Sequence, residues 1–273
     1  MLHPKAAESH GITRRLTIVR TKALNLMRRI FPALAAWIDR VRANREFVKE
    51  FAQFSELQNR FPISRFEMLW KDRHPILNEK TEFTHFDAHY TYHPAWAARV
   101  LAQLRPEEHV DISSTLHFST MVSAFIPTKF YDYRVALLNL SNLEAKKADL
   151  TNLPFADNSI KSLSCMHVVE HIGLGRYGDS LDPDGDLKAI AELKRVVQNN
   201  GVLLFVVPVG KGSKIYFNAH RVYTYQQIVS YFTGFHIEQF ALVDDQGRFT
   251  LNANSGDADQ QNYGCGCWYF IKD

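Results

Sequence analysis

Short apolar runs alternate with amphipathic stretches along the second half of the chain. The apolar runs have strand length and predict β-strands over residues 109–113, 134–138, 159–166 and 201–207. Other stretches follow a helical period and predict helices over residues 95–104, 185–198 and 224–232. Two last apolar runs, 236–243 and 266–271, enclose a polar loop without a helix. The pattern predicts an α/β fold with a mostly parallel sheet, helices on both faces and an antiparallel edge hairpin.

The N-terminal part of the chain has a helical pattern instead. Its apolar residues recur three, four and seven positions apart, which places them on one face of a helix. They are Leu16, Val19, Ala23, Leu26, Met27 and Ile30. Pro32 is expected to end or bend this helix, and a second helix continues to about residue 57. Three regions are therefore predicted: a basic amphipathic helical extension (1–58), an aromatic-rich lid or linker (59–94) and the α/β domain (95–273).

The charge of the chain is unevenly spread. The formal net charge is +3, yet residues 1–50 hold eleven Lys and Arg against four Asp and Glu, a local balance of +7. Because a basic amphipathic helix can lie on an anionic membrane surface, residues 14–31 are a candidate for peripheral contact with the inner membrane face. The alternative is that this helix packs on the α/β domain or on a second subunit. No nucleic-acid partner is expected.

Three further features concern the compartment. No apolar run reaches about 18 residues, so no membrane-spanning helix is expected. Arg28 and Arg29 interrupt the best candidate for a signal peptide. Cys165, Cys265 and Cys267 are too few, and odd in number, for a disulfide framework. We therefore expect a cytoplasmic protein.

Several segments resemble known proteins. Asp149–Ser159, Ser164–His171, Ala191–Val196 and Gly201–Pro208, in this order, resemble the second half of a class I S-adenosylmethionine-dependent methyltransferase. From residue 86 onward the chain resembles an uncharacterised methyltransferase-like family related to the type 11 methyltransferases. That likeness rests on the strings His171–Asp179, Asp182–Asp186 and Phe217–Arg221. It implies a Rossmann-like sheet, S-adenosylmethionine as cofactor, and a small-molecule or glycan acceptor, because bacterial relatives look like components of surface-polysaccharide biosynthesis.

The cofactor is expected at the carboxyl ends of the strands, where open parallel sheets bind ligands. The residues that the resemblance assigns to it are Asp111, Ser113, Asn139, Asp149 and His167. Serines and a threonine at 113–115 replace the glycines that would let the backbone approach a ligand closely. Asn139 is aligned with an acidic residue that accepts both ribose hydroxyls, and an amide lacks that charge. Asp149 corresponds to the acid that meets the adenine amino group, or else is a turn residue.

The acceptor is expected between the loops after the fourth and fifth strands, because their carboxyl ends border one crevice. Candidate catalytic residues are Glu170, His171 and His220, which could serve as a base for a hydroxyl acceptor. Candidate substrate-binding residues are Arg176, Tyr177, Asn218 and Arg221, whose guanidinium groups suit a phosphate or carboxylate. The competing interpretation is that these residues tie the two loops together as structure.

Three patterns have the residue types of metal sites. They are His167-x-x-Glu170-His171, His85-x-x-x-His89-x-x-x-His93 and Cys265-Gly-Cys267. The first is the inverted zincin pattern, but it falls at a strand end instead of within a helix. The second requires a helix, which Thr91 and Pro94 disfavour, and the third is short and isolated. We predict no metal site.

Two functions follow from these observations. The first is an active S-adenosylmethionine-dependent methyltransferase acting on a polar, hydroxylated acceptor, such as a sugar. The second is a catalytically inactive module of the same fold that binds a sugar, a lipid head group or a partner protein. The replaced glycines and Asn139 favour the second function, whereas Asp149 and the dense polar loops favour the first.

Overall fold

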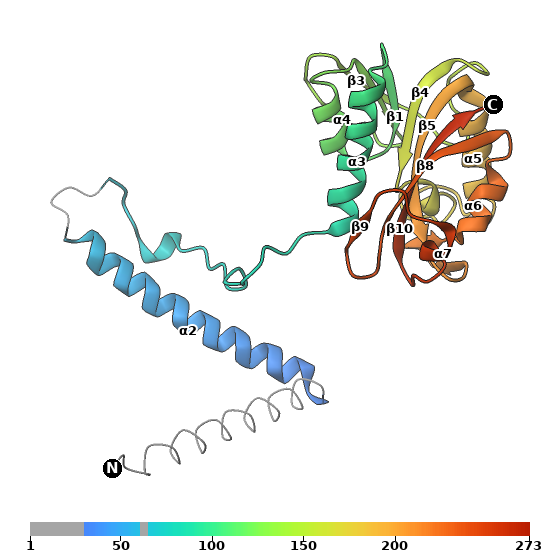
Figure 1. Ribbon diagram of the computed structural model, residues 1–273. Coiled ribbons are helices and arrows are strands. Elements are labelled where there is room, and N and C mark those ends of the chain that lie inside the picture. The colour runs from blue at the N-terminus through green and yellow to red at the C-terminus, as the bar shows by residue number, and fades with distance from the viewer. Residues whose placement is uncertain (1–29, 61–64) are drawn as a thin grey trace, which may run out of the picture. The chain divides into compact units, whose positions relative to one another are not determined.

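The computed structural model describes residues 30–60 and 65–273 of the chain (Figure 1). The chain divides into two compact units, residues 1–85 and 86–273. Most of the predicted basic helix at 14–31 lies outside the described residues, so its membrane contact stays a prediction, as do the boundaries at 58 and 94. Among the described residues, no helix is long and apolar enough to cross a membrane.

In the described part of the first unit there are one long helix, α2 (Pro32–Gln58), and a short 3-10 helix, η1 (Trp70–Asp72). Pro32 stands in the first turn of α2, where a missing N–H removes no hydrogen bond. The ring of Trp70 packs edge-on against Phe51 of α2, with 4.9 Å between the ring centroids. Exposed ion pairs from Lys80 to α2 add little, so ring packing is the main contact described within this unit.

The second unit is built on an eight-stranded sheet with the order β3-β2-β1-β4-β5-β10-β8-β9. The parallel part comprises β1 (His109–Ile112), β2 (Thr128–Asp132), β3 (Leu143–Lys147), β4 (Ile160–Met166) and β5 (Val197–Val209). The antiparallel part comprises β8 (Phe235–Val243), β9 (Phe249–Thr250) and β10 (Gly264–Lys272), with β10 paired between β5 and β8. The predicted fold class is therefore confirmed, with its parallel sheet and antiparallel edge.

One predicted strand is wrong. Residues 134–138 form a loop in which Leu137 is 98% exposed, although Ala136–Leu138 is apolar. The second strand is instead Thr128–Asp132, which buries Phe130 and Tyr131. A third strand, Leu143–Lys147, went unpredicted because it is an edge strand with charged side chains.

The helices of the second unit are α3 (Ala88–Leu104), α4 (Leu116–Val122), α5 (Gly185–Val196), α6 (Tyr225–Tyr231) and α7 (Ser255–Ala258). The predicted helices at 185–198 and 224–232 are confirmed. Helix α3, which was predicted to start at residue 95, starts at Ala88. The Asp87 side chain accepts a hydrogen bond from the Tyr90 N–H and thereby caps the N-terminus of the helix. Pro94 lies inside α3, so the objection to a helix through His89 and His93 was wrong.

The sheet separates two apolar cores, because alternate side chains of a strand point to opposite faces. On one face, Leu203 and Phe205 of β5 pack with Leu193 of α5. On the other face, Leu204 and Val206 pack with Trp96 of α3, together with α4. Figure 1 shows α3 and α4 on one side of the sheet and α5 and α6 on the other. Both faces of the second half of β5 are therefore buried, which explains the apolar run from Val202 to Val209.

Candidate functional site

Two adjoining cavities, of about 200 Å³ and about 110 Å³, lie at the carboxyl ends of β1 to β4. They share five lining residues: Ser113, Tyr133, Val168, Ile172 and Tyr177. We call these two cavities the strand-end cleft. Its position is the one in which open parallel sheets bind ligands, as the sequence predicts.

The loop after β1 keeps a glycine-like backbone without a glycine. Ser113 has φ 53°, in the left-handed region that an L-residue enters at a cost of about 1 kcal/mol. Its N–H and hydroxyl both donate to the carbonyl oxygen of Tyr131, at 2.8 Å and 3.1 Å. These two bonds hold the turn in place, so the loss of glycine has not changed its direction. Ser113 lines both cavities.

The end of β2 carries an acidic residue that the sequence analysis missed. Asp132 is the last residue of β2 and lines the smaller cavity. Its Oδ1 accepts a bond from the Arg134 N–H at 2.8 Å. Asn139, assigned to this position, lies seven residues further on in an exposed loop, so that placement is wrong. The error follows from the misplaced second strand, whose actual last residue is Asp132.

The two other predicted aspartates, Asp149 and Asp111, differ in their position relative to the cleft. Asp149 lines the larger cavity, and its Oδ1 accepts bonds from the N–H and the hydroxyl of Thr151, at 2.8 Å and 2.7 Å. Asp149 is therefore a turn residue, which was the alternative prediction for it, and it still faces the cleft. Asp111 is fully buried in the sheet and accepts from the hydroxyls of Ser119 and Ser164. Burial raises the pKa of Asp111 to about 6, and its carboxyl lies beneath the cleft instead of lining it.

The loop after β4 forms one wall of the cleft. The Asp179 carboxylate accepts the N–H groups of Gly173, Gly175 and Tyr177, at 2.8 Å, 3.3 Å and 3.1 Å. Burial would raise the pKa of Asp179, but these backbone bonds outweigh it and lower the pKa. The loop is thus closed around a carboxylate, and Asp179 and Asp182 line the larger cavity.

A buried acid and two imidazoles follow β4 directly. Glu170 and His171 lie in the short helix η2 (Val169–His171), and His167 precedes it with φ 57°. Glu170 Oε1 lies 2.7 Å from His167 Nδ1 and 3.8 Å from His171 Nε2. Burial raises the pKa of Glu170 to about 7 and lowers the pKa of His167 to about 4. Both imidazoles are therefore neutral near pH 7, where Glu170 is close to its midpoint.

The loops after β4 and β5 meet as the topology predicts. The second loop carries a hairpin of β6 (Lys214–Tyr216) and β7 (His220–Val222). His171 Nδ1 donates to the carbonyl oxygen of Ala219 at 2.6 Å, and Arg176 Nη1 donates to the same oxygen at 3.0 Å. His220, the next residue, is half-buried, and burial lowers its pKa. Glu170, His171 and His220 thus lie together beside the strand-end cleft.

The predicted substrate-binding residues separate into three groups. Tyr177 lines both cavities, and the guanidinium groups of Arg134 and Arg176 lie 4.6 Å and 5.2 Å from its ring centroid. Asn218 is exposed in the hairpin turn. Arg221 is only 4% exposed and does not line the strand-end cleft, which contradicts its predicted role.

Arg221 holds loops together instead of facing the cleft. Its guanidinium donates to the carbonyl oxygens of Ile172 and Pro183, at 2.6 Å and 3.1 Å, and lies 3.6 Å from an Asp186 oxygen. The hydroxyl of Tyr223 donates to Asp186 at 2.9 Å. Arg221 therefore ties the two loops together as structure, as the competing interpretation of the sequence held.

Comparison with known proteins supports the resemblance found in the sequence. A family described as "Caenorhabditis protein of unknown function, DUF268" matches residues 133–264. This segment contains all three strings on which the likeness to an uncharacterised methyltransferase-like family rests, and that likeness is confirmed. An uncharacterized protein of Methanocaldococcus jannaschii is 33% identical over 90 residues, which are 32% of this chain. The match spans about a third (34%) of that relative's length.

Solved structures with similar arrangements are distant in sequence. The YcgJ protein of Bacillus subtilis aligns with a TM-score of 0.46 at 14% identity, over 67% of this chain and 98% of that one. The 1,6-didemethyltoxoflavin-N1-methyltransferase of Burkholderia thailandensis, solved with 1,6-didemethyltoxoflavin and S-adenosylhomocysteine, aligns with a TM-score of 0.47 at 11% identity. That alignment covers 67% of this chain and 79% of the methyltransferase.

Proposed function

We propose that the chain is an S-adenosylmethionine-dependent methyltransferase that modifies a polar, hydroxylated acceptor. The observation that carries the proposal is the strand-end cleft, which has a carboxylate after β2 (Asp132) and another after β3 (Asp149). The chemistry of these donors and acceptors fits the cofactor. Asp132 would accept the ribose hydroxyls, and Asp149 would accept the adenine amino group through the oxygen that Thr151 does not use.

The loop after β1 also fits a bound cofactor. The backbone of Ser113 is already left-handed, as a glycine there would be, and its hydroxyl is a small polar group at the wall of the cleft. When bound, the cofactor would supply the electrophilic methyl group. The contribution of the protein is then to align acceptor and methyl group and to exclude water, and such positioning supplies much of the rate in transfer reactions.

The residues beside the cleft suit a hydroxyl acceptor, whose oxygen must lose a proton. His171 Nδ1 donates to a carbonyl, so its Nε2 carries the lone pair and is the atom able to accept a proton. Burial lowers the pKa of both His171 and His220, which keeps both rings neutral near pH 7. Arg176, exposed at the rim, adds a positive charge for an anionic acceptor such as a sugar phosphate.

Calorimetric titration with S-adenosylmethionine and S-adenosylhomocysteine tests the cofactor site. Asp132→Asn is expected to weaken binding on the order of tenfold or more, because hydrogen bonds to a charged acceptor contribute about 1.5–3 kcal/mol. Asn139→Ala is the matched control, since Asn139 is exposed outside the cleft, and its affinity is expected to equal the wild-type value. Absence of heat with millimolar cofactor, or equal affinities for wild type and Asp132→Asn, would overturn the proposal.

A methyl-transfer assay, run beside the titration, separates the proposal from an inactive module of this fold. An active enzyme binds the cofactor and transfers its methyl group to a member of a panel of sugars and sugar phosphates. His220→Ala is expected to lower that transfer while changing cofactor affinity less than about twofold, because His220 lies on the acceptor side. Normal cofactor binding without transfer to any panel member would favour the inactive module, for which the replaced glycines argue.

A further inference from the structure

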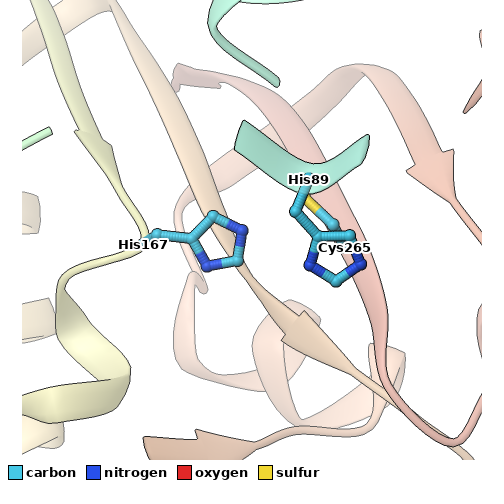
Figure 2. A group of neighbouring side chains, drawn as sticks. All are labelled: His89, His167 and Cys265. Atoms are coloured by element: carbon cyan, nitrogen blue, oxygen red, sulfur yellow. The ribbon is translucent and has the colours of Figure 1, made fainter. Parts of the chain in front are cut away.

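Three side chains with strong metal-binding groups meet beside the strand-end cleft (Figure 2). His89 comes from the first turn of α3, His167 from the residue after β4, and Cys265 from the start of β10. Their ligand atoms all lie within 4.8 Å of one another. We propose that His89, His167 and Cys265 bind a divalent transition metal, with zinc as the best match. This site goes beyond the proposed methyl transfer and does not depend on it.

The bonding of His167 supports a metal independently of the spacing. Its Nδ1 lies 2.7 Å from Glu170 Oε1, and an ionised Glu170 can only accept, which places the proton on Nδ1 and leaves the lone pair on Nε2. Nε2 is buried and has no hydrogen-bond partner among the described residues. An unpaired buried nitrogen destabilises the folded chain, and a metal ion would satisfy it. A carboxylate that holds the far nitrogen of an imidazole is the usual support of a metal-ligating histidine.

The protonation of the three groups is compatible with metal binding. Burial lowers the pKa of His89 and of His167 to about 4, so both rings are neutral near pH 7, as ligation requires. Burial raises the pKa of the Cys265 thiol, so this group gives up its proton only when the metal arrives. Metal binding is therefore expected to release a proton and to weaken as the pH falls.

The set of donors selects the kind of metal. Two imidazole nitrogens and one sulfur suit zinc and its neighbours among the transition metals, whereas calcium and magnesium require oxygen ligands. Three protein ligands leave one tetrahedral position for water or a bound molecule, as in catalytic zinc sites. His167 also lines the smaller cavity of the cleft.

The earlier prediction of no metal site rested on sequence patterns taken singly. Each of the three patterns contributes one residue to the cluster, and none contributes two. Segments separated by more than 70 residues in sequence meet here only because α3 and the ends of β4 and β10 pack together. A bound metal would link these three elements.

Metal content and cobalt spectroscopy of the purified full chain test the proposal. After growth with added zinc and gel filtration, we expect about one zinc per chain by mass spectrometry. Replacement of zinc by Co²⁺ is expected to give the charge-transfer absorption of a cobalt–thiolate bond. Cys265→Ala should lose this absorption. Cys267→Ala, which removes the neighbouring thiol 3.8 Å away, should keep it.

Further variants guard against a folding defect. His89 is only partly buried near the start of α3, so His89→Ala should fold and yet lose most of the zinc. Glu170→Gln should weaken zinc binding about 10–100-fold, as changes to such supporting carboxylates do. A wild-type chain without stoichiometric zinc or the cobalt–thiolate absorption would overturn the proposal. Equal zinc in wild type, His89→Ala and Cys265→Ala would also overturn it, because the metal would then lie elsewhere.

Discussion

The sharpest stability prediction concerns Gly173, where two segments of the cleft wall cross. Its backbone has φ 79°, and a Cβ placed there would lie 2.1 Å from the carbonyl oxygen of Asp182. Ordinary contact begins at 3.4 Å, so the two backbones would have to separate by more than about 1 Å. The Asp182 N–H donates to the Gly173 carbonyl at 2.9 Å, and that bond would be stretched or lost.

The expected cost of Gly173→Ala is the sum of three effects. The left-handed backbone costs an L-residue about 1 kcal/mol. Forcing a methyl group into a packed crossing costs about 1–3 kcal/mol, and a lost hydrogen bond about 1 kcal/mol. Together these lower the free energy of unfolding by about 4 kcal/mol, or the melting temperature by about 10 °C for a unit of this size.

Gly178→Ala is the matched control for this prediction. Gly178 lies in the same loop with φ 84°, but a Cβ there would meet nothing within 4 Å. Gly178→Ala should therefore lower the free energy of unfolding only by the cost of a left-handed backbone at an L-residue, about 1 kcal/mol. Unfolding in urea is followed by tryptophan fluorescence, which reports on the second unit through the buried Trp96 and Trp268. Similar losses for the two variants, or a loss below about 2 kcal/mol for Gly173→Ala, would refute the reasoning.

Two further predictions follow from buried charges. Burial raises the pKa of Glu170 from 4.5 to about 7, so its ionisation costs the folded state stability as the pH rises through that range. In a chelating buffer, Glu170→Gln should therefore gain stability over wild type between about pH 4.5 and 7, by about 3 kcal/mol in all. A difference independent of pH in urea titrations would contradict this. Arg221→Met should lose about 3 kcal/mol, because it removes the cation beside the buried Asp186, whereas Arg176→Met should lose only about 1 kcal/mol, the contribution of its hydrogen bond to Ala219. Equal losses in thermal unfolding would show that Arg221 is not an anchor.

The fold could be predicted wherever burial leaves a strong periodic signal. The second half of β5 is buried on both faces, and its apolar run predicted it; in β4 every residue but Lys161 is buried, and its apolar and small residues predicted it. The apolar run Ala136–Leu138, which lies in a loop with Leu137 exposed, misled the prediction of β2, because apolar composition does not distinguish a buried strand from a surface loop. The charged strand β3 gave no apolar signal at all.

The site could be predicted only as far as topology places it. The meeting of the loops after β4 and β5 follows from neighbouring strands, and so does the position of Ser113 and Asp149. Asp132 was missed because a strand was displaced by a few residues. The partners of Arg221 are mostly backbone carbonyls, which every residue has, so no sequence pattern marks them. The approach of His89 to Cys265 depends on tertiary packing alone.

The anchoring of the β6–β7 hairpin has a consequence for how this protein could diversify. Arg221 and Tyr223 fasten its base to the loop after β4 and to α5, while Tyr216 and Phe217 at its tip are 47% and 75% exposed. The contacts that stabilise the hairpin thus lie at its base, whereas its exposed contact surface lies at its tip. Exposed positions tolerate substitution within about 0.5 kcal/mol. The tip can therefore change in sequence between relatives, and with it the range of molecules that are bound, while the scaffold stays intact.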